Sequence, residues 1–453
     1  FYIIKNGTSG AHTVQLKAVS GSGATVTFAA DDKGYKIIYL DGVATNTGVF
    51  DAALSSDGIT FKEGGTNFTN SLLVGTDSTG TLSSADGNTG VGTGVLGALT
   101  TGDNNVAVGL CALKANTTGS QNTALGSISL CAGTTGDFNT AVGEKSMMGV
   151  VTGDSNAAFG QGSLRCNTSG CFNTASGAAA LAANTTACNN VAVGKSALAA
   201  NTTGTSNVAV GTTSLDANTT GNNITAVGYN ALTANTTASS NVAFGAYVLA
   251  ANTTGASNVG LGKSALEKNT TAANNTAVGT FSLRCNTTGT ENVAVGTSAL
   301  CKNTTANANT AVGANTLFTN TTGTFNVALG NGALYANTTG DDNVGIGKNS
   351  LDTNTTGDEN TAVGRDALTA NTTASENTAV GAYSLGTNTT GAANVAVGRG
   401  ALQVNTTGGF NTAVGTGSST ENTTASNNTA FGGEAMKKTT TASSNTAVGT
   451  SAL

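Results

Sequence analysis

Residues 360–376 read NTAVGRDALTANTTASE, and residues 377–393 repeat the pattern as NTAVGAYSLGTNTTGAA. The glycine of this phrase recurs from Gly75 to Gly449 in 22 steps of 17 residues, so 23 glycines stand in register without an insertion. Positions are counted here from zero at the residue, usually Asn, four before each such glycine. A fixed period of this kind is the signature of a repeat architecture.

The unit is too short for the helix pairs of helical repeats, which need 33 residues or more. Val or Thr at positions 1 and 3, with Ala between them, gives the alternation of a short strand. We therefore expect two or three short strands per unit, joined by tight turns. Equal units that stack form an all-β parallel β-solenoid, and 23 coils at about 4.8 Å each make a rod of roughly 110 Å.

Three positions of the unit are assigned structural roles. Glycine at position 4 implies a positive φ or no room for a Cβ. Leucine at position 8 supplies the core, and asparagine at position 11 forms a ladder whose amides pair along the stack. Position 14 alternates between Gly and Ala, so it requires small volume. The residues chosen to represent these roles are Gly109, Gly194, Gly279, Gly364, Gly449, Leu198, Leu300, Asn201 and Asn286.

The core of one coil is thin, and the direction of its valines stays open. If positions 1 and 3 face inward, Ala at position 2 lines the surface; in the converse arrangement a valine stripe lies outside. In both cases a weakly polar strip runs the length of the rod. Long exposed apolar strips usually mark an interface. We therefore expect self-association around an axis parallel to the rod.

The first residues do not carry the period. Residues 1–50 are predicted to form a small antiparallel β module, with strands at 1–5, 12–18, 24–28 and 35–40. Residues 51–70 are expected to be a connector, and residues 71–453 the solenoid. The chain starts at Phe1 and stops at Leu453 inside a coil, so we expect polypeptide on both sides of this segment.

The composition disfavours most chemistry. Charged residues make up 9% of the chain and His12 is its single histidine, which removes the commonest general base and metal ligand. We therefore expect no enzymatic activity, no catalytic or metal-binding residues and no cofactor. The chain has no Lys/Arg cluster that would favour binding to nucleic acid, and no run of 18 apolar residues that would favour insertion into a membrane.

Several residues carry alternative interpretations. Cys171 and Cys188 both occupy position 15 in adjacent coils, close enough for a possible disulfide, whereas the other five cysteines are interpreted as packing residues. Asp137 and Asp154 are adjacent at the same position, where a depolymerase acid pair or a calcium site is less favoured than a solvated turn. The 17 Asn-x-Thr/Ser matches at position 11 are formal glycosylation acceptors. The paired threonines that follow suggest ice binding only weakly, because adjacent side chains diverge.

The phrase at residues 360–368, followed by Asn-Thr-Thr at 371–373, resembles repeats in phage tail-fibre proteins, notably those of marine phages. It is also similar to the head repeats of trimeric autotransporter adhesins, whose coils form parallel β-rolls. Residues 1–42 resemble the small β modules of cyanophage-type tail fibres. The resemblance implies a homotrimer and binding to a host surface.

These observations favour a non-enzymatic structural protein, the shaft of a viral (phage) tail fibre that lies outside the cell on the virion. It would hold a tip that binds a host-surface glycan or protein, although no tip is evident in these residues. The alternative is a microbial cell-surface adhesin or extracellular filament. A third hypothesis is a glycan depolymerase on a β-helix.

Overall fold

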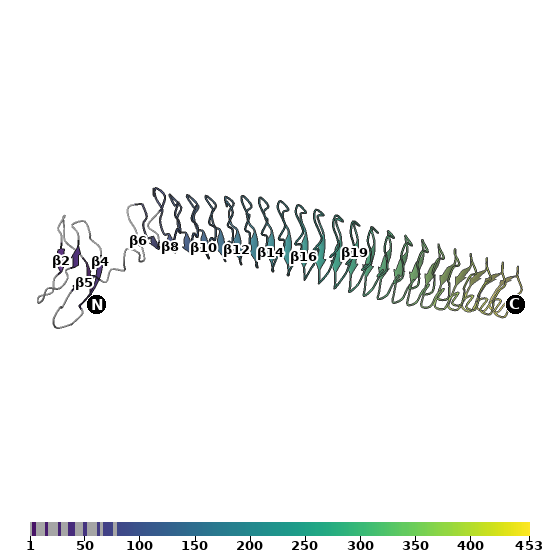
Figure 1. Cartoon of the computed structure of the whole chain (residues 1–453). Coiled ribbons are helices and arrows are strands. Elements are labelled where there is room, and N and C mark those ends of the chain that lie inside the picture. The colour runs from purple at the N-terminus through teal and green to yellow at the C-terminus, as the bar shows by residue number, and fades with distance from the viewer. Residues whose placement is uncertain are drawn as a thin grey trace.

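The computed structural model describes residues 67–75 and 79–453 in full and, before them, the backbone of six short strands. Its fold is all-β, and no described residue is helical. The repeats form a rod of stacked coils, with one strand of each coil following the next along the same side (Figure 1). The predicted parallel β-solenoid of 17-residue coils is confirmed.

The strands before the repeats are short and antiparallel. β1 (Tyr2–Lys5), β4 (Tyr35–Leu40) and β5 (Val49–Asp51) form one sheet, and β2 (Val14–Leu16) pairs with β3 (Val26–Phe28). They overlap the four strands predicted from the sequence and add β5. The predicted connector also holds a strand, β6 (Phe61–Glu63), which pairs antiparallel with β7.

The solenoid contains 23 parallel strands of three residues. They are β7 (Leu72–Val74), β8 (Thr89–Val91), β9 (Val106–Val108), β10 (Thr123–Leu125), β11 (Thr140–Val142), β12 (Ala157–Phe159), β13 (Thr174–Ser176), β14 (Val191–Val193), β15 (Val208–Val210), β16 (Thr225–Val227), β17 (Val242–Phe244), β18 (Val259–Leu261), β19 (Thr276–Val278), β20 (Val293–Val295), β21 (Thr310–Val312), β22 (Val327–Leu329), β23 (Val344–Ile346), β24 (Thr361–Val363), β25 (Thr378–Val380), β26 (Val395–Val397), β27 (Thr412–Val414), β28 (Thr429–Phe431) and β29 (Thr446–Val448). Each pairs with the next without a register shift, as Val208 does with Thr225.

The prediction of two or three strands per coil is wrong, because each coil has one. Positions 6, 8 and 16 take positive φ, as at Ser196 (55°), Leu198 (53°) and Ser206 (58°), and these kinks turn the rest of the coil into tight bends. The bends still bond from coil to coil: the N–H groups of Leu198 and Ala200 donate to the carbonyls of Ser214 and Asp216 at 2.9 Å. The backbone stays paired without further strands.

The open question about the valines is resolved in favour of the outward orientation. Alanine at position 2 is buried, with Ala107 and Ala209 at 0% exposure, whereas the neighbouring positions 1 and 3 face outward. Val106 is 40% exposed and Phe244 is 53% exposed. The small residue faces inward because the interior of a 17-residue coil has little room.

The apolar half of the interior consists of alanine at positions 2 and 7 and leucine at position 8. Leu198 and Leu300 are fully buried, as expected, although both have left-handed backbone conformations with φ of 53° and 51°. That conformation costs an L-residue roughly 1–2 kcal/mol. Burying a leucine side chain contributes about 1.5–3 kcal/mol, which offsets the strain.

The other half of the interior is polar and contains two asparagine ladders. In the predicted ladder at position 11, Asn201 Nδ2 donates to the carbonyl of Gly204 at 2.9 Å and to Asn184 Oδ1 at 3.2 Å. A second ladder at position 0 includes Asn190, whose Nδ2 donates to the same Gly204 carbonyl at 2.9 Å. Backbone N–H groups also donate to this ladder, as Asn207 N does to Asn190 Oδ1 at 3.0 Å. The buried amides therefore satisfy one another along the rod.

Glycine at position 4 meets both conditions predicted for it. Its φ is positive at all five of the glycines named from the sequence. In the four coils that are followed by another coil, a Cβ added to this glycine would overlap the backbone of that next coil. The φ values are 128° at Gly109, 134° at Gly194, 130° at Gly279, 138° at Gly364 and 123° at Gly449. Position 14 differs as expected, because Gly204 lacks a positive φ and Ala187 fills the equivalent place with 1% exposure.

One pair of coils shows how tightly the apolar half is filled. Position 7 holds Val248 where most coils have Ala or Ser, and position 2 of the next coil holds Gly260 instead of Ala. A Cβ added to Gly260 would lie 2.4 Å from Val248 Cγ1. The two exceptions therefore compensate each other in volume.

Replacing Gly260 with alanine is expected to destabilise this coil by about 1–3 kcal/mol, because it overpacks the core. The double variant Val248→Ala/Gly260→Ala restores the usual residue pair and should regain most of that loss. Hydrogen exchange of peptides covering residues 241–275 measures the local opening free energy. Equal protection of the Gly260→Ala variant and the parent protein would contradict the volume argument.

Candidate functional surfaces

The aspartates of position 15 have a structural role in the turn. Asp154 Oδ1 accepts the N–H of Asp137 at 2.8 Å, and Asp358 Oδ1 accepts that of Asp341 at the same distance. Asn, Ser and Thr occupy the position in most other coils, and Ser239 Oγ accepts the N–H of Asn222 at 3.0 Å. The carboxylates thus stabilise the turn of the preceding coil, which agrees with a solvated turn better than with a catalytic pair.

Cys171 and Cys188 also take part in this row. Both are free thiols in the structure, and Cys188 Sγ accepts the N–H of Cys171 at 3.1 Å. The possible disulfide is thus absent from the structure, in which each sulfur takes the place of the side-chain oxygen of the neighbouring turns. Cys111, Cys131, Cys166, Cys285 and Cys301 are likewise free and partly buried, and burial raises the pKa of the Cys131 and Cys301 thiols.

The asparagines of the formal glycosylation acceptors are inside the rod. Asn201 and Asn286 have 0% exposure and their amide nitrogens donate hydrogen bonds, so the folded coil does not present them to solvent. The two threonines that follow diverge as expected. Thr202 Oγ1 donates to the carbonyl of Thr219 at 3.0 Å, whereas Thr203 faces solvent. The exposed threonines therefore form a single column.

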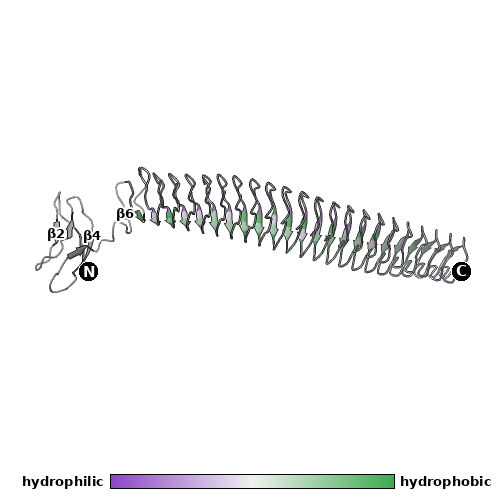
Figure 2. Cartoon of the chain, in the orientation of Figure 1, coloured by the Kyte–Doolittle hydropathy of each residue, from purple (hydrophilic) through white to green (hydrophobic). Residues whose placement is uncertain are grey.

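The outward side chains of strand positions 1 and 3 form the strand face. Its valines, leucines and phenylalanines follow the sheet along the rod, and Figure 2 shows the hydrophobic colour concentrated on the strands. The members that are more than a third exposed include Leu72, Val91, Val106, Leu125, Phe159, Val193, Val242, Phe244, Val259, Leu261, Val327, Leu329, Val380, Val395, Phe431 and Val448. Such a contiguous apolar surface is unusual for a protein that acts as a monomer.

Positions 5, 6, 9 and 10 form a second surface, the basic edge, beside the carboxyl ends of the strands. Within residues 79–453 every Lys and Arg lies on it: Lys114, Lys145, Arg165, Lys195, Lys263, Lys268, Arg284, Lys302, Lys348, Arg365, Arg399, Lys437 and Lys438. It also carries seven carboxylates: Glu144, Asp216, Glu267, Asp352, Asp366, Glu421 and Glu434. The thirteen cations thus exceed the carboxylates by six.

Aromatic rings strengthen the basic edge locally. Arg284 lies over the Phe281 ring at 5.1 Å and its Nε meets Glu267 Oε2 at 2.9 Å. This hydrogen bond raises the pKa of the Arg284 guanidinium. Burial, assisted by repulsion from Asp366, raises the pKa of the Asp352 carboxyl. The surface therefore combines paired and unpaired charges with stacked rings.

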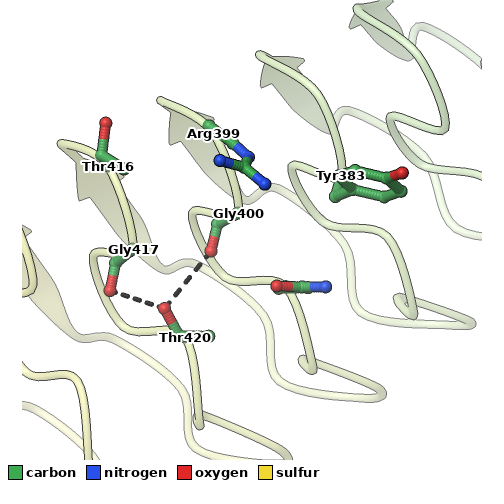
Figure 3. A pocket seen from close by; sticks show the side chains of 7 residues that line it. Tyr383, Arg399, Gly400, Thr416, Gly417 and Thr420 are labelled. Atoms are coloured by element: carbon green, nitrogen blue, oxygen red, sulfur yellow. Dashed lines mark hydrogen bonds between the residues drawn. The ribbon is translucent and has the colours of Figure 1, made fainter.

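A shallow hollow of about 300 Å³ opens on the basic edge (Figure 3). It exists because position 6 is glycine in two adjacent coils, at Gly400 and Gly417, where most other coils carry side chains. Arg399 and Tyr383 lie on one side of it, and Thr420 Oγ1 donates to the Gly417 carbonyl at 2.6 Å. The hollow is open to solvent, and the polar side chains of Gln403 and Thr416 complete its lining.

Positions 15 and 16 form the acidic edge, beside the amino ends of the strands. Within residues 79–453 it carries no Lys or Arg and ten carboxylates: Asp86, Asp103, Asp137, Asp154, Glu291, Asp341, Asp342, Asp358, Glu359 and Glu376. Every ion pair of this part of the chain lies on the basic edge instead. The rod is therefore polarised across its width, with the strand face between two edges of opposite charge.

Two features escaped the interpretation of the sequence, although both are visible in it. The ladder at position 0 is a column of Asn as regular as that at position 11, and sorting the charged residues by repeat position separates the two edges.

In the described part of the chain, no group of three or more His, Cys, Asp or Glu side chains is arranged to hold a metal ion. No helix there is long and apolar enough to cross a membrane.

Comparisons with protein-family models, with curated proteins and with solved structures found no match to this chain.

Proposed function

We propose that the protein is the non-enzymatic shaft of a viral (phage) tail fibre, a homotrimer that holds a host-binding tip away from the virion. The observation that carries this proposal is the uninterrupted stack of 23 in-register strands with an apolar strand face along its side. A continuous parallel sheet with a filled core is stiff, and the number of coils sets its reach, at about 4.8 Å per coil.

The strand face is the surface that we assign to self-association. A strip about 105 Å long and roughly 10 Å wide, the breadth of three strand residues, gives about 1,000 Å² per copy. A standard two-body interface buries about 800 Å² per partner, so the strip suffices for one such interface. In a trimer each copy divides the strip between two neighbours, and the surfaces beside the strand face must add to it. A second copy of this chain is the partner that fits this face, because its apolar side chains recur along a straight line at the same spacing.

Glutamate on the strand face is expected to separate the copies. In the variant Phe244→Glu/Leu261→Glu/Leu329→Glu all three side chains are exposed in a single rod, so folding is retained, whereas assembly would bury three unpaired charges. Sedimentation should find the full chain at three times 43.9 kDa and the variant at the mass of one copy.

The control places glutamate on the exposed threonine column of the same coils, as Thr254→Glu/Thr271→Glu/Thr339→Glu, and should keep the mass of the parent. A monomeric parent chain, or a strand-face variant that stays assembled, contradicts the proposal. Antibodies against the chain should label tail appendages of virus particles in electron micrographs. Label confined to a cell envelope would instead identify a surface adhesin.

A further inference from the structure

We infer that the two charged edges fix the direction in which copies of the rod associate, so that they assemble parallel and in register. This inference rests on the proposed self-association through the strand face. The strand face by itself selects a direction only weakly, because most coils present Val or Thr at position 1 and Val, Leu or Phe at position 3. The charged edges can select a direction, because one side of the strand face is acidic and the other side is basic.

Symmetry connects the edges to the direction. When parallel copies turn their strand faces toward a common axis along the rods, rotation about that axis brings the acidic edge of each copy beside the basic edge of its neighbour. When one of two facing copies is inverted end for end, acid lies beside acid and base beside base. Juxtaposed like charges suppress the wrong arrangement, and opposite charges favour the right one.

The positions of the charges along the rod give the same direction. The acidic edge is charged at residues 86–154 and 291–376 and uncharged between them, and the cations of the basic edge lie at 114–195, 263–399 and 437–438. Parallel copies in register place all six acids of the second stretch opposite its cations. An end-for-end inversion would instead bring these acids beside the acidic edge of the neighbour.

Within residues 79–453 the acidic edge also lacks an ion-pair partner in its own chain. Asp342, Glu359 and Glu376 occupy position 16 of successive coils and are exposed, so like charges follow one another at about 4.8 Å. No ion pair of residues 79–453 reaches them. A neighbouring copy in register supplies Lys348, Arg365 and Arg399 from the same group of coils, which offsets the repulsion.

Charge exchange tests the inference on the full chain. The acidic-edge variant carries Lys in place of four carboxylates that make no hydrogen bond in the structure: Glu291, Asp342, Glu359 and Glu376. The basic-edge variant carries Glu in place of four cations outside the ion pairs: Lys263, Lys268, Lys348 and Arg399. Within residues 263–399 these changes shift the acidic edge from a net charge of −6 to +2 and the basic edge from +4 to −4. Each variant alone therefore gives this stretch two edges of the same sign, and the eightfold variant exchanges the signs and restores complementarity.

At low ionic strength each single-edge variant should associate roughly tenfold or more weakly than the parent, and the eightfold variant should recover. Salt at about 1 M should reduce the differences, because the Debye length falls to about 3 Å. The control variant should assemble as the parent does. It carries Lys in place of four exposed threonines of the threonine column: Thr322, Thr339, Thr356 and Thr373. Gold bound to a C-terminal tag should mark one end of each assembled rod in electron micrographs.

Gold at both ends overturns the inferred direction. Parallel assemblies that both single-edge variants leave intact overturn the role of the edges, while the proposed association through the strand face stands. The role of the edges in assembly is also overturned if the basic-edge variant keeps the oligomer mass of the parent but is no longer retained on a polyuronate resin. The basic edge would then bind a soluble polyanion instead of a neighbouring copy. A parent chain that is monomeric at every ionic strength contradicts both this inference and the proposed self-association.

Discussion

Replacing Gly279 with valine is expected to open its coil, with a loss of local stability of at least about 3 kcal/mol. The φ of 130° lies in a region that glycine alone adopts readily. A Cβ there would also lie 2.5 Å from the carbonyl oxygen of Gly296 and 2.6 Å from its carbon, in the backbone of the next coil. The backbone strain of about 1–3 kcal/mol and the cost of the overlap with the next coil are added together in this expected loss. The sequence alone supports only the lower range of about 1–3 kcal/mol.

Hydrogen exchange of peptides from residues 262–296 measures the effect, and a loss of 3 kcal/mol corresponds to roughly 100-fold faster exchange. The matched control is Gly162→Asn. Gly162 has a φ of 63° with no atom within 4 Å of an added Cβ, and Asn230 occupies the same repeat position with a φ of 52°. The control should change stability by less than about 1 kcal/mol. Unchanged protection around Gly279→Val would refute the account of position 4.

Replacing Asn286 with leucine is expected to cost at least about 2–4 kcal/mol, because the amide is lost and two larger methyl groups take the place of its oxygen and nitrogen. Asn286 Nδ2 donates to Asn269 Oδ1 at 2.9 Å, and Asn286 Oδ1 accepts from Asn303 Nδ2 at 2.8 Å. The substitution leaves Asn269 Oδ1 without a donor inside the rod and removes one acceptor from Asn303. The Gly289 carbonyl keeps its bond from Asn275 at 2.8 Å, so the damage is confined to the ladder.

The control for this prediction is Asn307→Ala, since Asn307 is exposed on the turn and water can replace its oxygen. Asn307 Oδ1 accepts the N–H of Thr290 at 2.7 Å, and its loss should cost less than about 1 kcal/mol. Exchange protection of residues 269–303 compares the two variants. Similar effects of both substitutions would show that the buried ladder contributes no more than a surface turn.

The repeat predicted the β-solenoid because a constant period leaves few ways to stack equal units. The same regularity predicted Gly279, Leu198 and Asn201 as structural residues, since identical side chains lie over one another in consecutive coils. The number of strands per coil was not predictable in this way. It depends on leucines such as Leu198 holding a positive φ, which alternation of side chains does not reveal.

The disulfide between Cys171 and Cys188 was a reasonable expectation from their spacing. Adjacent coils bring their backbones close, but the structure uses each sulfur as an acceptor for a backbone N–H. Spacing alone gives proximity and not the direction of a side chain. The same limit applied to the valines of positions 1 and 3, whose orientation stayed open until the size of the coil interior was known.

The sequence by itself determined that equal coils stack in register, because neither an insertion nor a proline interrupts the 17-residue period. It also determined which columns of side chains lie over one another, and therefore where the ladders and the charges run. The tertiary structure alone decided which columns face inward. That choice depends on how narrow the closed coil is: alanine and the amides of asparagine fit inside it, and the valines are left on the strand face between the two edges.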